Sequence, residues 1–122
     1  MGLDKLEEIV GIPYKKEPPY SLEKGVNCLA WVSHVYQMHG INLFAKFNDL
    51  RYWREHFIKI KGTPKFLDIV LMYSVTIGER HVGVMLDDYR MTQSSSITNG
   101  VAICEISRNP WVNAIKGFYR YK

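Results

Sequence analysis

The strongest constraint on the fold of this chain is a change in residue pattern around Gly62 and Pro64. Before this point, apolar residues recur at helical spacing over residues 27–39 and 47–57. After it, turn residues separate five short segments rich in β-branched and aromatic residues, namely 68–74, 81–87, 89–94, 100–106 and 115–121. Helices followed by consecutive strands predict an α+β domain, with N-terminal helices packed on a mostly antiparallel five-stranded sheet.

The residues before these helices predict a short helix and then a long loop. Residues 3–10 place apolar side chains at helical spacing and are followed by Gly11, a common helix stop. Residues 11–26 contain three prolines, which predicts a loop that is long for so small a domain. Long structured loops in compact domains often line functional sites. Asn27 then fits the N-cap position of the helix over 27–39.

Length and composition indicate one globular domain. The chain has 122 residues, of which 47% are hydrophobic and 23% are charged. This composition excludes an intrinsically disordered chain, and the length predicts a single domain over residues 1–122. The two cysteines, Cys28 and Cys104, are too few for a disulfide scaffold, so both are expected to be free thiols.

The charge and hydropathy patterns exclude two classes of partner. The net charge is +4, and the basic residues are scattered rather than clustered, so nucleic-acid binding is not expected. No stretch approaches the roughly 20 apolar residues of a membrane span, so stable membrane insertion is not expected either. The first residues lack the apolar core of a signal peptide. We therefore expect a soluble chain that is cytoplasmic, associated with a phage particle, or exported by another route.

A cysteine, a histidine and a glutamine stand at positions suited to thiol chemistry. Cys28 is predicted in the first turn of a helix, where free N–H groups and a partial positive charge stabilise a thiolate. The same N–H groups could donate hydrogen bonds to the oxyanion of an acyl-transfer intermediate. His81 opens an apolar strand, and Gly83 beside it permits close backbone approach. If 81–87 and 89–94 form a hairpin, Gln93 returns level with His81, and its amide can orient the imidazole.

Simpler explanations exist for each of these residue types. A cysteine at a helix start is often an inert buried thiol, and Cys104, inside a strand, is expected to belong to the core. His34 and His39 are expected at the surface, and His56 at the surface or in packing. No histidine has a cysteine or carboxylate at zinc-ligand spacing, so no metal site is expected. The run Ser94–Ser96 predicts a loop, since it lacks the glycine-flanked turn of a serine hydrolase.

Five motifs, in this order, resemble those of the NlpC/P60 family. The family's G-x-P-Y stretch corresponds to Gly11–Tyr14, and its cysteine at a helix start corresponds to Cys28. Its D-(I/L)-V strand corresponds to Asp68–Val70, and its H-V-G-(I/V) strand to His81–Val84. Its polar third residue, with serines behind it, corresponds to Gln93–Ser96. The resemblance covers nearly the whole chain.

This resemblance implies a papain-like fold and a specific hydrolysis. The family's usual activity is cleavage of the bond after γ-D-glutamate in the stem peptides of bacterial peptidoglycan. The resemblance assigns Cys28 as nucleophile, His81 as general base and Gln93 as the group that orients the imidazole, with no metal or cofactor. Tyr14 would lie near the oxyanion or the substrate amine. The other substrate-binding residues expected are Tyr20, on the loop before the cysteine, and Asn27.

The chain departs from the family pattern beside the cysteine. Asn27 replaces the family's acid, and Leu29–Ala30 replaces its Ser-Gly. In many members that Asp and Ser help hold the free amine of the substrate's first residue. Asn27 keeps a polar group without charge, and Leu29 has no hydrogen-bonding group, so altered muropeptide specificity is expected. Leu67 also stands where the strand motif has glycine.

Two other functions fit the sequence. Related papain-like domains include acyltransferases and lipid-directed enzymes, which the altered residues beside Cys28 and the basic charge also allow. The same alterations fit a non-catalytic binding or structural domain in a phage tail or a wall-associated complex. For the hydrolase, the expected partner is a cell-wall peptide or another amide substrate. A domain without wall-binding modules also usually depends on a protein partner for targeting.

Overall fold

The computed structural model of this chain describes residues 11–43, 49–74 and 79–122. The predicted helix over 3–10 lies outside these residues. The described helices are α2 (Cys28–Met38) and α3 (Leu50–His56). The strands are β1 (Phe57–Ile60), β2 (Ile69–Ser74), β3 (Glu79–Met85), β4 (Arg90–Ser95), β5 (Gly100–Glu105) and β6 (Ile115–Tyr121).

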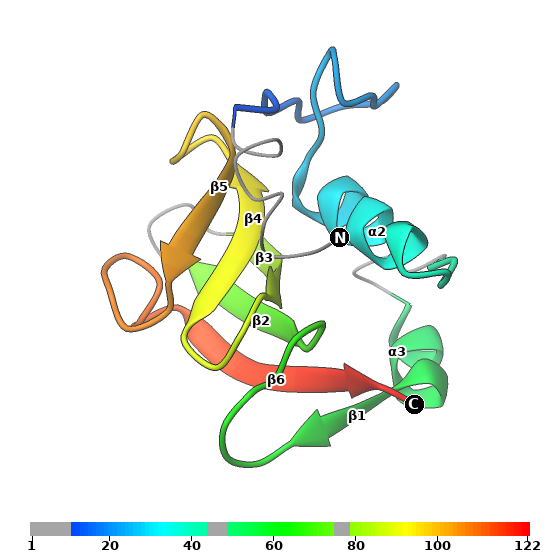
Figure 1. Cartoon of the computed structure of the whole chain (residues 1–122), viewed down its shortest axis with the longest axis vertical. Coiled ribbons are helices and arrows are strands. Elements are labelled where there is room, and N and C mark those ends of the chain that lie inside the picture. Colours follow the sequence, from blue (N-terminus) through cyan, green and yellow to red (C-terminus); the bar gives the residue numbers. More distant parts are fainter. Residues whose placement is uncertain (1–10, 44–48, 75–78) are drawn as a thin grey trace.

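The strands form one antiparallel sheet in the order β1-β6-β2-β3-β4-β5. The consecutive strands β2 to β5 are neighbours, whereas the last strand, β6, lies between β1 and β2. Figure 1 shows β4 and β5 rising steeply from the level of β6 and β1, so the sheet is strongly twisted. The predicted α+β class and antiparallel sheet are confirmed. Within the described residues, the sheet has six strands rather than the predicted five.

Strand β1 is the one that the sequence did not predict. The predicted helix over 47–57 ends one residue earlier, at His56, and Phe57 begins the strand. Phe57 and Ile58 are both apolar, although Ile58 is exposed. These four residues therefore lack the apolar–polar alternation that indicates a strand. Pairing with β6, where Phe57 lies opposite Tyr121, provides the hydrogen bonds that fix β1.

Helix α2 corresponds closely to the predicted helix over 27–39, and it packs across β3 and β4. Its fully buried side chains are Trp31, Val32, Val35 and Tyr36. The indole Nε1 of Trp31 donates a hydrogen bond of 3.0 Å to Thr92 Oγ1 on β4, so this buried polar pair is satisfied. Leu29, in the first turn of the helix, is only half-buried.

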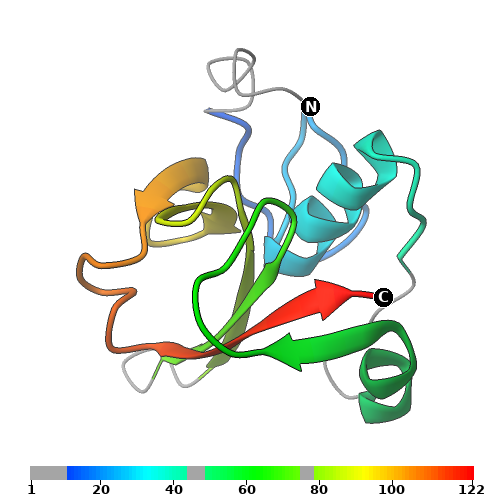
Figure 2. The ribbon, with the colours of Figure 1, turned by 60° about the horizontal axis from the view of Figure 1, so that its bottom comes forward.

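The core has two parts, one on each face of the sheet. Helix α2 covers one face, and the connection between β5 and β6, with Trp111 and Ala114 buried, covers the other. Figure 2 shows α2 and this connection on opposite sides of the strands. Successive side chains of a strand point to opposite faces, and in β2 Ile69 packs toward α2 and Val70 toward Trp111.

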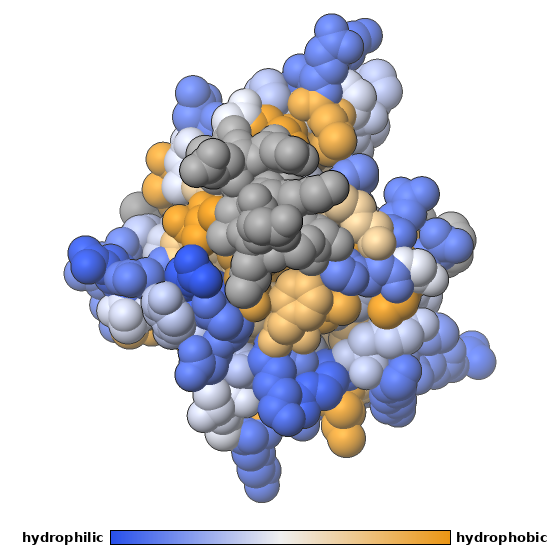
Figure 3. Space-filling view, viewed as in Figure 1, coloured by the Kyte–Doolittle hydropathy of each residue, from blue (hydrophilic) through white to orange (hydrophobic). Residues whose placement is uncertain are grey.

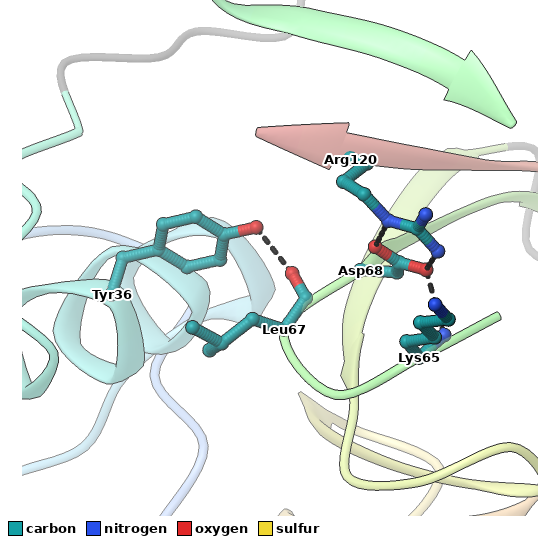
Figure 4. Close-up of polar contacts among 5 residues, drawn as sticks. All are labelled: Tyr36, Lys65, Leu67, Asp68 and Arg120. Atoms are coloured by element: carbon teal, nitrogen blue, oxygen red, sulfur yellow. Dashed lines mark hydrogen bonds and ion pairs between the residues drawn. The ribbon is translucent and has the colours of Figure 1, made fainter. Parts of the chain in front are cut away.

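A buried ion pair fixes the start of β2 (Figure 4). Asp68 is 1% exposed, and its carboxylate accepts hydrogen bonds from Arg120 Nε (2.8 Å), Arg120 Nη2 (2.7 Å) and the backbone N–H of Lys65 (2.7 Å). Beside it, the Tyr36 hydroxyl donates to the Leu67 carbonyl. Burial, followed by the charge of Asp68, raises the pKa of Tyr36, which therefore stays a neutral donor. Leu67 itself has φ of 73°, the left-handed region that favours glycine.

No helix in the described ranges is both long and apolar enough to cross a membrane. On the face shown in Figure 3, hydrophilic side chains fill most of the outline, and hydrophobic ones form smaller patches among them.

Candidate active site

Backbone hydrogen bonds hold the loop before Cys28 in place. Val26 N donates to the Pro13 carbonyl (2.9 Å), and Lys15 N donates to the Val26 carbonyl (3.2 Å). The same Val26 carbonyl accepts a 2.7 Å bond from the buried Ser94 Oγ of β4. Tyr14 pairs with Val26 in this bridge, so the predicted tyrosine lies beside the residue that precedes the helix cap.

Asn27 caps α2, as predicted, and Cys28 is the first residue of the helix. The Asn27 Oδ1 atom accepts a 2.8 Å hydrogen bond from Ala30 N, and its Nδ2 donates a 2.8 Å bond to Tyr20 Oη. Cys28 is 9% exposed and forms no disulfide. The thiol therefore lies at the positive end of the helix dipole, where a thiolate is stabilised.

Tyr20 lies close enough to Cys28 to interact with it electrostatically. Its hydroxyl donates a 2.9 Å hydrogen bond to the Lys16 carbonyl. Burial raises the pKa of Tyr20, and the negative charges of Glu17 and of the Cys28 thiolate raise it further. The two predicted binding residues Tyr20 and Asn27 are thus brought together, and Tyr20 is near the thiol.

His81 and Gln93 form a buried hydrogen-bonded pair, with 2.9 Å between His81 Nε2 and Gln93 Oε1. They are 7% and 0% exposed. Val84 lies opposite Thr92 in the antiparallel pairing of β3 and β4, which puts Gln93 level with Gly83 rather than with His81. The histidine is the next residue on the same face of β3, so the glutamine side chain reaches it diagonally.

Replacing Gly83 with alanine is expected to disturb this pair. The new Cβ would lie 2.9 Å from Met91 Sδ, 3.1 Å from the Thr92 carbonyl oxygen and 3.4 Å from Gln93 Cβ. Because a backbone atom must move, we expect the free energy of unfolding to fall by about 1–2 kcal/mol. Alkylation of the candidate nucleophile should slow about tenfold, since small misplacements of a catalytic group are costly.

Thermal unfolding and the alkylation rate measure these two effects. Gly117→Ala is the matched control, because the closest contact of its new Cβ would be the flexible end of Lys59. If Gly83→Ala alkylates at the wild-type rate, close approach at this glycine does not matter for the pair.

Trp111 and Cys104 enclose the other side of the pair. The Trp111 ring stacks on His81 with a centroid distance of 5.9 Å and an interplanar angle of 21°. Gln93 Nε2 lies 3.6 Å from Cys104 Sγ, and the Trp111 side chain also hydrogen-bonds to this thiol. Burial raises the pKa of Cys104, so this second thiol is neutral near pH 7. Cys104 was expected only in the core, and no residue pattern marked Trp111.

Two hydrogen bonds, one to α2 and one to the residue before its cap, locate the His81–Gln93 pair relative to the helix start. Ser94 donates to the carbonyl two residues before Cys28, and Trp31 donates to Thr92. Gln93 lies between these two residues of β4 and holds the histidine. The pair is therefore carried by the part of β4 that contacts the first turn of α2.

A model of the NlpC/P60 family matches residues 15–120 of this chain. The chain belongs to the NlpC/P60 family. No curated protein sequence matches it. Among solved structures, it is similar to a lipoprotein-like protein of the NLP/P60 family from Staphylococcus aureus subsp. aureus Mu50, with 17% sequence identity and a TM-score of 0.71. The alignment covers 97% of this chain and 39% of that protein.

Membership of the NlpC/P60 family places the chain in the papain-like superfamily of cysteine peptidases and amidases. Members of the family are generally cysteine peptidases. The fold expected from the resemblance is confirmed, whereas the solved structure, at 17% identity, supports the fold alone.

Two hollows lie on the same side of the sheet as α2 in this NlpC/P60 domain. One, of about 580 Å³, is lined by residues of α3, β1, β2, β3 and β6, and Cys28, His81 and Gln93 do not line it. The other, of about 530 Å³, runs along α2 from Tyr20 and Ala30 toward its C-terminal half. Cys28, His81 and Gln93 do not line this second hollow either, although the candidate binding residue Tyr20 does.

Several minor expectations for this NlpC/P60 domain were wrong. Ser94 and Ser95 belong to β4 and are buried, because the strand extends further than its apolar residues indicate. His34 and His39 are half-buried rather than exposed, since they pack on Trp31 and Phe66 respectively.

Among the described residues, no three His, Cys, Asp or Glu side chains are grouped as metal ligands.

Proposed function

We propose that this NlpC/P60 chain is a thiol hydrolase of peptide or amide bonds, with Cys28 as nucleophile, His81 as general base and Gln93 as positioning residue. The observation that carries the proposal is the buried 2.9 Å contact between His81 and Gln93, on a strand bonded to the helix start that holds Cys28. A histidine held at Nε2 presents Nδ1 for proton transfer, which is the arrangement that activates a cysteine in papain-like enzymes.

The proposed reaction uses these residues in turn. The Cys28 thiolate attacks the substrate carbonyl, and the resulting oxyanion needs N–H donors near the thiol. The Ala30 amide is bonded to the Asn27 side chain and the Trp31 amide to the Asn27 carbonyl. The amides of Cys28 and Leu29 are therefore the better candidates for the oxyanion. His81 then protonates the leaving amine, and as a base it activates the water that hydrolyses the acyl-enzyme.

The proposed substrate is a peptidoglycan stem peptide, cut after γ-D-glutamate, as is usual for the family. In this chain, we expect the substrate group that lies beside Asn27, next to the scissile residue, to be uncharged. Asn27 carries no charge, and both ends of its amide are already bonded, to Ala30 and to Tyr20. A free ammonium group of the substrate would therefore find no carboxylate at this position.

The substitution Asn27→Asp is expected to raise the preference for a free N-terminal amine. An aspartate side chain can still cap α2, and it adds the carboxylate that this chain lacks. We expect kcat/KM for a peptide with a free amine to rise about tenfold relative to its N-acetylated form, the typical value of one charge-assisted hydrogen bond. Paired assays of the two peptides measure the ratio. An unchanged ratio would mean that residue 27 does not face the substrate amine.

The proposed function is tested by digesting purified muropeptides and following them by mass spectrometry. Cys28→Ala is the matched negative control, because it removes only the thiol. The expected result is a new product ending in γ-D-glutamate with wild type alone. No product beyond the control would exclude this substrate. An acyl group trapped on Cys28 without peptide cleavage would instead indicate an acyltransferase.

A further inference from the structure

A continuous chain of buried and half-buried hydrogen bonds leads from the Gly100 carbonyl to His81. The Thr98 hydroxyl donates a 2.7 Å bond to the Gly100 carbonyl oxygen. Thr98 Oγ1 in turn lies 3.0 Å from Gln93 Nε2, and Gln93 Oε1 lies 2.9 Å from His81 Nε2. Thr98 and Gly100 belong to the β4–β5 connection and the start of β5, so neither is part of the motif that suggested the site.

The direction of each bond in this chain is fixed by chemistry. A backbone carbonyl can only accept, so the bond to Gly100 uses the single proton of the Thr98 hydroxyl. Thr98 Oγ1 must then accept from Gln93, which directs the NH₂ end of the amide toward Thr98. The oxygen end therefore faces His81, and an oxygen can only accept, so His81 Nε2 carries a proton.

The other neighbours of the amide are compatible with this direction but do not impose it. Cys104 Sγ, 3.6 Å from Gln93 Nε2, is a weak donor and a weak acceptor, so it tolerates either end of the amide. Ser95 Oγ, 3.2 Å from Thr98 Oγ1, can rotate its proton toward Thr98. Thr98 is thus the contact that distinguishes the two orientations of the Gln93 side chain.

We propose that Thr98 is a positioning residue, which sets the orientation of the Gln93 amide and thereby the ring nitrogen on which neutral His81 keeps its proton. With Nε2 protonated, Nδ1 holds the lone pair and can take the proton of Cys28. Valine at position 98 would let the amide rotate and offer its NH₂ to Nε2, which favours the unproductive Nδ1–H form. The catalytic meaning of this role rests on the proposed function, but the tautomer itself does not.

The tautomer is measured by long-range ¹H–¹⁵N NMR of the His81 ring, assigned by its loss in His81→Ala. The Cys28→Ala background removes the thiolate that would hold the ring charged. In this background we expect the Nε2–H form alone, and a mixture with Nδ1–H after Thr98→Val. Thr98→Ser keeps the hydroxyl, so it should show the Nε2–H form alone, as with threonine. An Nδ1–H ring with Thr98 intact would overturn the proposal without any variant at position 98.

A second measurement follows the reactivity of Cys28 by peptide mass spectrometry, which separates its alkylation by iodoacetamide from that of Cys104. At pH 6.5 we expect Thr98→Val to slow alkylation of Cys28 about tenfold, the factor for losing one hydrogen bond of ordinary strength. Thr98→Ser should stay within about twofold of wild type. Equal tautomers and rates in the valine and serine variants would refute the role of Thr98.

These readouts use no peptide substrate, so they separate the two proposals. If the tautomer and the alkylation rates behave as expected while muropeptides remain intact, the positioning role holds and the substrate assignment fails. If muropeptides are cleaved but Thr98→Val keeps the Nε2–H form, the hydrolase proposal holds and Thr98 is not its positioning residue.

Discussion

His81→Ala is expected to raise the pH midpoint for alkylation of Cys28 toward about 8.5, the value of a free thiol. An ion pair with the imidazolium keeps a thiolate populated down to lower pH, so wild type should remain reactive at pH 6. The variant loses about 100-fold in thiolate fraction there if the wild-type midpoint is about 6. A thiolate of higher pKa is more nucleophilic, which offsets about tenfold of this loss. The observed rate at pH 6 should therefore fall about tenfold.

Peptide hydrolysis should respond more strongly than alkylation to the same substitution. The histidine also transfers protons to the leaving amine and from water, so we expect kcat to fall by about 10²–10⁴-fold. His39→Ala is the matched control, because His39 caps the opposite end of α2 and packs on Phe66. The assignment of His81 as base fails if both histidine variants give the same pH midpoint as wild type.

Much of the fold could be predicted because local pattern and tertiary role agree. Helix α2 has a polar cap at Asn27 and a regular apolar face, and strands β2 to β6 have strand-forming residues between clear turns. Strand β1 could not be predicted, because its four residues gain their partner only when β6, nearly 60 residues later, lies beside them. Such long-range pairing leaves no periodic signal in the local sequence.

The candidate site was predictable to the extent that its residues carry their own chemistry. Cys28 begins a helix as predicted, whereas His81 and Gln93 lie inside β3 and β4 rather than at the strand ends expected. The contact between His81 and Gln93 nevertheless has the predicted partners. Thr98 and Trp111 gave no such signal. A threonine in a turn and a tryptophan in a connection have many ordinary uses, and only the folded chain brings them to Gln93 and His81.

Asp68→Ala is expected to lower the free energy of unfolding by about 3 kcal/mol, the usual cost of breaking a buried, hydrogen-bonded ion pair. The substitution removes three charge-assisted acceptor contacts, two from Arg120 and one from the Lys65 amide. The Arg120 side chain is 38% exposed and can be hydrated in the variant, so the loss in the free energy of unfolding should not exceed about 3 kcal/mol. The thermal midpoint should fall by about 10 °C for a domain of this size.

Asp88→Ala is the matched control for this loss, because Asp88 is exposed in the turn between β3 and β4 and should change stability by less than about 0.5 kcal/mol. The effect of Asp68 should also be confined to stability. Its hydrogen-bond partners, Lys65 and Arg120, do not include His81, Gln93 or the loop before Cys28. Folded Asp68→Ala should therefore alkylate at the wild-type rate well below its midpoint. A stable variant with slow alkylation would instead mean that Asp68 acts on the site, and that the start of β2 and the His81–Gln93 pair are coupled.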